Sequence, residues 1–123
     1  MLKRSGSSAG ATYLNRPQRV AAIREAVSRA AGRLGTLRRV VLFGSLADGI
    51  PTPRSDADLL VEVSESPYPE PRDRIPDLLC ALSPLPCPVD LFVLTSEEIE
   101  NSRARGSPFL EMILRTGVVL WQG

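Results

Sequence analysis

The chain has 123 residues and a mass of 13.4 kDa, the size of one domain with a single hydrophobic core. Hydrophobic residues make up 43% of it and charged residues 24%, which is typical of a globular protein. It has no histidine and only two cysteines, Cys80 and Cys87, so histidine-dependent nucleophiles, histidine-ligated metals and four-thiolate zinc sites are excluded. Catalysis would therefore use carboxylates, hydroxyls, Lys, Arg or a hard metal ion held by oxygen.

The net charge of +1 is unevenly distributed. Residues 1–54 carry ten basic and two acidic side chains, whereas residues 55–123 carry five basic and twelve acidic ones. A basic half can bind nucleic acid, but aromatic residues make up only 5% of the chain, which argues against stacking of bases on rings. We interpret the arginines as a solvated helix face and expect no direct binding of nucleic acid.

The first residues are polar and small, without the hydrophobic segment of a signal peptide. We predict a flexible arm over residues 1–14 and one domain over residues 15–123. No apolar run approaches the roughly 18 residues that a membrane span needs. We therefore expect no contact with a membrane, a cytoplasmic location and reduced cysteines.

The elements follow from periodicity and from turn residues. Asn15 is suited to cap a helix with apolar residues every three to four positions up to Leu34. The remaining segments are a strand at 38–43, turn residues at 48–55, a strand at 57–63, a proline-rich loop at 64–72, a helix between Pro76 and Pro84, a strand at 89–94, a short helix capped by Thr95 or Ser96, a helix at 109–115 and a strand at 117–121. This order predicts an α/β (α+β) fold, a small mixed β-sheet with helices packed on it. We expect Phe109 and Trp121 in the core or at a partner interface.

Gly44-Ser45 stands where the first strand must turn. A glycine at this place lets a phosphate approach the backbone, and the Ser45 hydroxyl and the next N–H groups can donate hydrogen bonds to its oxygens. The pair alone is more typical of an ordinary turn and cap, because Gly-Ser is common in loops.

Asp56 and Asp58 stand at the start of the second strand, and ten residues separate Ser45 from Asp56. Alternate residues of a strand share a face and lie roughly 6.5 Å apart, so both carboxylates can bind one cation or bridge two. Asp90, at the entry of the strand at 89–94, would lie beside Asp58 if the two strands are neighbours. Three carboxylates next to a phosphate-binding turn indicate a two-metal site for phosphoryl or nucleotidyl transfer.

The segments LFGSLADG at residues 42–49 and SDADLLV at residues 55–61 resemble the nucleotidyltransferases of the DNA polymerase β superfamily, and within it the minimal nucleotidyltransferases. The resemblance covers roughly residues 20–94. It implies a mixed-sheet, nucleotidyltransferase-like core in which three aspartates and two Mg²⁺ ions transfer a nucleoside monophosphate from a nucleoside triphosphate, here ATP.

The resemblance also implies roles for five residues of this chain. Gly44 and Ser45 would hold the triphosphate. Asp56 and Asp58 would hold the metal ions. Asp90 would complete one metal site and help to deprotonate the acceptor hydroxyl.

Many minimal members of the superfamily are antitoxins that attach AMP to a tyrosine of a HEPN-type ribonuclease toxin. The resemblance therefore implies a protein acceptor, and the small size of the chain agrees, because transferases for antibiotics or polynucleotides usually need a further domain. Asp48 departs from the pattern, since members often have Arg there, and Arg54 is the nearest candidate to replace that charge. Asp48 favours the alternative hypothesis, a catalytically degenerate module that inhibits its partner by contact alone.

Overall fold

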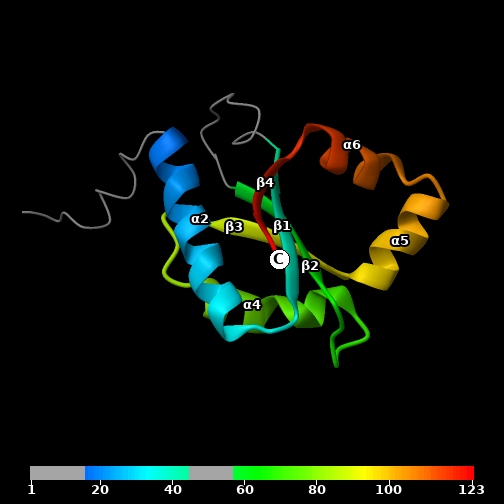
Figure 1. The fold of residues 1–123 in the computed structure, drawn as a ribbon, viewed down its shortest axis with the longest axis horizontal. Coiled ribbons are helices and arrows are strands. Elements are labelled where there is room, and N and C mark those ends of the chain that lie inside the picture. The colour runs from blue at the N-terminus through cyan, green and yellow to red at the C-terminus, as the bar shows by residue number, and fades with distance from the viewer. Residues whose placement is uncertain (1–15, 45–56) are drawn as a thin grey trace, which may run out of the picture.

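The computed structural model describes residues 16–44 and 57–123, and the strands in these ranges form one mixed sheet (Figure 1). The predicted arm at 1–14 lies outside the described residues. The elements are α2 (Arg16–Arg33), β1 (Leu37–Phe43), β2 (Ala57–Val63), the 3-10 helix η1 (Pro71–Arg74), α4 (Ile75–Leu82), β3 (Val89–Thr95), α5 (Ser96–Ala104), α6 (Pro108–Thr116) and β4 (Val118–Gln122).

The strand order is β3-β2-β1-β4. β1 is antiparallel to both β2 and β4, whereas β2 and β3 are parallel. A parallel pair needs a crossover connection, and here η1 and α4 supply it. The predicted mixed sheet with packed helices is confirmed.

Helices cover both faces of the sheet, with α2 and α4 on one side and α5 and α6 on the other (Figure 1). The first core lies between the sheet and the α2–α4 side, and the second lies between the sheet and the α5–α6 side. Alternation along β2 places Leu59 and Val61 in the first core and Leu60 in the second. Asp58 and Phe92 therefore share the face of Leu60, because each is an even number of positions from it in the register.

The helix ends explain where the chain changes direction. Thr95 caps α5: its side chain accepts from the Glu98 N–H at 3.2 Å, and Glu98 Oε1 accepts from the Thr95 N–H at 2.8 Å. The segment at 64–72, predicted as loop, leads into the helical turn η1, where Pro71 fixes the first helical position.

Two arginines of α2 do more than face solvent. Arg24 donates to the carbonyls of Val119 and Leu120, at 3.4 and 3.0 Å, and so covers part of the open edge of β4. Arg29 donates to the carbonyl of Pro84 at 3.4 Å. Both side chains are exposed, so these contacts do not contradict the interpretation of a solvated helix face. In the ranges that the structure describes, no helix is long and apolar enough to cross a membrane.

Candidate active site

Gly44 ends β1 in a conformation that favours glycine, with φ at +83°. The sequence analysis explains this glycine by the approach of a phosphate to the backbone. The structure adds a second reason, because a Cβ built on Gly44 would collide with Oδ2 of Asp58. Gly44 therefore leaves room for the Asp58 carboxylate.

Asp58 and Asp90 lie side by side at the end of the sheet where the parallel strands β2 and β3 begin. Asp58 pairs with Asp90 across the parallel β2–β3 ladder and with Phe43 across the antiparallel β1–β2 ladder. Paired residues of neighbouring strands lie about 5 Å apart at their Cα atoms. Asp58 is half-buried and Asp90 is exposed. The predicted neighbourhood of these two carboxylates, which depended on the strand order, is thus found.

The pair fits a divalent cation by its chemistry. Two neighbouring carboxylates repel each other and gain from a positive charge between them. Mg²⁺ prefers oxygen ligands and usually takes one or two carboxylates, with water and substrate phosphates completing its shell. Ser45 and Asp56 lie outside the described residues, so their predicted roles stay predictions. Within residues 16–44 and 57–123 no three metal-ligating side chains gather, and the third carboxylate is expected from Asp56.

Phe43, Phe92 and Phe109 form a ring cluster on the same face, which we term the phenylalanine cluster. Their ring centroids lie 5.5, 5.8 and 5.6 Å apart, in tilted and edge-to-face contacts. Phe43 is buried, whereas Phe92 and Phe109 expose 40% and 46% of their surface. Phe109 is not buried in the core, so of the two places expected for it only a partner interface stays open. Trp121 packs against the first core as expected. Sequence reasoning missed Phe92, although it follows Asp90 by two positions on one strand.

A family model described as a nucleotidyltransferase domain matches residues 20–114 of the chain. The chain belongs to this nucleotidyltransferase family. The match contains Gly44, Asp58 and Asp90, so the geometry above lies within the family's domain. The resemblance seen in the sequence motifs is confirmed.

Solved structures share the nucleotidyltransferase fold. One is a crystal structure of a candidate nucleotidyltransferase from Sulfolobus solfataricus, with 20% identity and a TM-score of 0.61 over 99% of this chain and 93% of that one. Another is a toxin–antitoxin structure with AMP-PNP, with 20% identity and a TM-score of 0.52 over 81% of this chain and 73% of that one. A comparison with curated proteins gives no significant match.

An ion pair lies at the opposite end of β3 from Asp90. Arg74 is 4% exposed and donates to both Glu98 oxygens, at 2.6 and 3.1 Å, and to the carbonyl of Val93 at 3.0 Å. The hydrogen bond from Arg74, together with the Thr95 N–H, lowers the pKa of Glu98. The same hydrogen bond raises the pKa of Arg74. These contacts join η1, β3 and α5.

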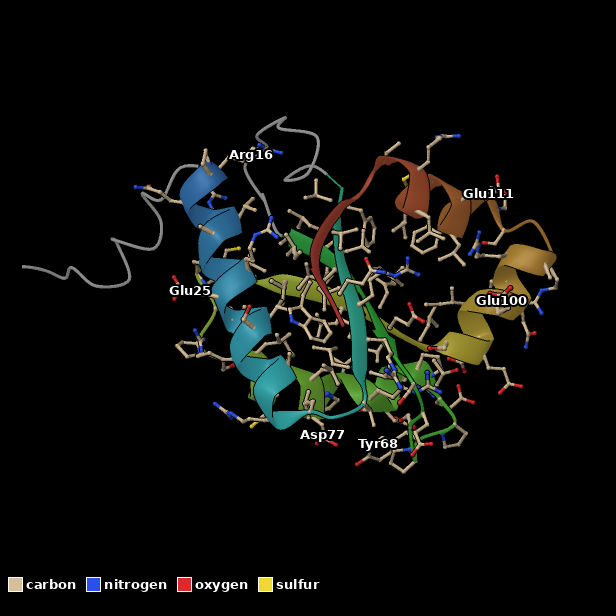
Figure 2. The ribbon with its side chains drawn as sticks, in the orientation of Figure 1. Arg16, Glu25, Tyr68, Asp77, Glu100 and Glu111 are labelled. Carbon is tan, nitrogen blue, oxygen red and sulfur yellow. The ribbon has the colours of Figure 1, made fainter. Side chains whose placement is uncertain are left out.

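A cavity of about 500 Å³ lies at this same far end, where Val63 and Val93 near the ends of β2 and β3 line it. At its rim the Tyr68 hydroxyl donates to Asp77 Oδ2 at 3.1 Å, and this bond raises the pKa of Tyr68 (Figure 2). Val63 is roughly 16 Å from Asp58 along β2. The cavity is therefore separate from the carboxylate pair.

Proposed function

We propose that this chain is a Mg²⁺-dependent nucleotidyltransferase that transfers AMP from ATP to a hydroxyl group, that of a tyrosine, on a partner protein. The observation that carries the proposal is the register that sets Asp58 beside Asp90 and against the Gly44 turn. Such a pair of carboxylates, next to the turn that we expect to bind phosphate, supports metal-assisted transfer at phosphorus. The family match over these residues supports the same reaction type.

In the proposed reaction the acceptor oxygen attacks the α-phosphorus of ATP in line. The new P–O bond forms as the bond from the α-phosphorus to the bridging oxygen breaks, and pyrophosphate leaves. Asp90, which is exposed, would help to accept the hydroxyl proton as the acceptor approaches. Bound Mg²⁺ supplies charge neutralisation at the attacking and leaving oxygens. Asp58 and Asp90 would hold it, with Asp56 as the expected third ligand.

We infer that the partner is a HEPN-type ribonuclease toxin and that the chain acts as its antitoxin. The sequence motifs resemble those of minimal nucleotidyltransferases, many of which work in this way. The fold likeness to a toxin–antitoxin structure with AMP-PNP supports both a protein partner and an adenine nucleotide. A protein acceptor also agrees with the exposed position of Asp90, because a large partner can reach it from solvent.

The second candidate is a degenerate module that inhibits its partner by contact alone. Asp48 favours it, since an acid near the turn repels a triphosphate. Asp48 and Arg54 lie outside the described residues. The retained pair of Asp58 and Asp90 argues against this candidate, because a binding module has no need of two neighbouring carboxylates.

The test captures the partner from a native lysate with the tagged protein, Mg²⁺ and ATP, and measures the intact mass of what co-purifies. We expect wild type to yield a partner heavier by one or more AMP units, and Asp58→Asn to capture the same partner with transfer reduced at least a hundredfold. Asp73→Asn removes an exposed carboxylate in η1 and should transfer normally. A partner captured equally by all three proteins, without added mass, would establish the binding module instead.

A further inference from the structure

We propose that the phenylalanine cluster is the platform on which the base of the nucleotide stacks, an inference that rests on the proposed function. The sheet register places the cluster directly beside the carboxylates. Phe43 is the Cα partner of Asp58, and Phe92 follows Asp90 by two positions on the same face of β3. That step is roughly 6.5 Å along a strand. An α-phosphate held at the carboxylates therefore leaves the ribose to span the gap to the rings.

The cluster is built to hold its exposed rings in place. Phe43 is 6% exposed and contacts both other rings, so it supports them from the side of the core. Phe109 stands near the start of α6, a helix that Leu110 and Ile113 anchor in the second core. A stacking surface of fixed orientation costs little side-chain entropy when a base binds.

The size of the exposed surface fits a base better than a protein. An aromatic side chain has about 150–250 Å² of surface, so the exposed parts of Phe92 and Phe109 offer roughly 200 Å² together. A stable protein interface buries about 800 Å² on each partner. Phenylalanine rings also lack hydrogen-bond donors and acceptors. The cluster would therefore bind a base more tightly the larger its stacking area, and it would discriminate little between adenine and guanine.

The test measures binding of ATP, GTP, UTP and inorganic tripolyphosphate, each with Mg²⁺, by calorimetry. Tripolyphosphate carries the phosphates without a base. Phe92→Leu keeps an apolar side chain and removes the ring, and we expect it to weaken ATP and GTP binding about five- to tenfold, UTP binding less, and tripolyphosphate binding less than twofold. Phe109→Leu should act in the same direction. Phe92→Tyr keeps the ring and should bind ATP about as tightly as wild type does. Met112→Leu, at an exposed side chain of α6, should also bind ATP as wild type does.

The outcomes separate the two proposals. If wild type binds ATP and Phe92→Leu binds it equally well, the stacking inference is overturned while the proposed function stands. If Phe92→Leu and Phe109→Leu bind ATP normally but transfer poorly to the captured partner, the cluster serves the acceptor protein and not the base. If wild type binds neither ATP nor tripolyphosphate, both proposals are overturned together. Near-ultraviolet circular dichroism of each variant confirms that the fold is intact.

Discussion

A glycine is required at position 44 because the side chain of Asp58, on the neighbouring strand, occupies the space of a Cβ. An alanine at 44 would meet two separate penalties. The backbone conformation costs an L-residue about 1–2 kcal/mol, and the added Cβ would displace the Asp58 carboxylate. We expect the backbone conformation to lower the free energy of unfolding of Gly44→Ala by about 1–2 kcal/mol. We expect the displaced carboxylate to weaken Mg²⁺-dependent ATP binding about tenfold or more, because roughly 1.4 kcal/mol of lost ligand contact has that effect.

Gly106 provides the matched control for this prediction. It also has a positive φ, of 72°, but nothing lies within 4 Å of a Cβ built there. Gly106→Ala should therefore show a similar loss of stability in urea and leave ATP binding unchanged. Equal ATP binding by Gly44→Ala and Gly106→Ala would contradict the role of the Gly44–Asp58 contact.

The junction of η1, β3 and α5 depends on the pair of Arg74 and Glu98. Glu98→Gln keeps a hydrogen-bonding side chain but removes the charge opposite a buried guanidinium. We expect a loss of about 1–2 kcal/mol in the free energy of unfolding at pH 7, below the roughly 3–5 kcal/mol of fully buried pairs, because Glu98 is partly exposed. Glu97→Gln, at an exposed position of the same helix turn, is the control and should change stability little. An equal loss in both variants would contradict the assigned role of the ion pair.

The same pair makes stability depend on pH in a definite direction. The pKa of Glu98 is lower in the folded chain than in the unfolded one, so the unfolded state binds the proton first as the pH falls. The stabilisation is complete above the ordinary carboxyl range and is lost as the pH falls through the folded-state pKa. Wild type should therefore progressively lose its advantage over Glu98→Gln in urea titrations as the pH falls below the ordinary carboxyl range. An advantage that stays constant as the pH falls would contradict the prediction.

Most elements could be predicted because their signals are local. Thr95 and Glu98 form a capping box that the sequence shows directly, and the strands follow from short β-branched runs. The burial of Arg74 could not be predicted, since its partners Val93 and Glu98 meet it only once β3 is placed beside η1. Charge in a proline-rich segment indicates solvent exposure when nothing else is known.

At the scale of the whole molecule, contacts that depend on the order of strands in the sheet could not be predicted from the sequence alone. The neighbourhood of Asp58 and Asp90 could be stated only as a condition, because two strands joined by a helix need not be adjacent in the sheet. The meeting of all three phenylalanines of the chain depends on the sheet order and on the position of α6 together. Their rarity argued against ring stacking, whereas their convergence on one face now favours it.

The carboxylate pair also predicts how the entire fold responds to metal. Mg²⁺ that binds only the folded state at ten times its Kd raises the free energy of unfolding by about 1.4 kcal/mol, and Tm rises by about 5 °C for a domain of this size. Asp58→Asn should abolish this shift, because it removes one of the two carboxylates expected to bind the ion. Asp73→Asn should keep the full shift, and chelation should reverse it. A wild-type Tm that is unchanged by Mg²⁺, measured by calorimetry with and without ATP, would exclude the pair as a metal site.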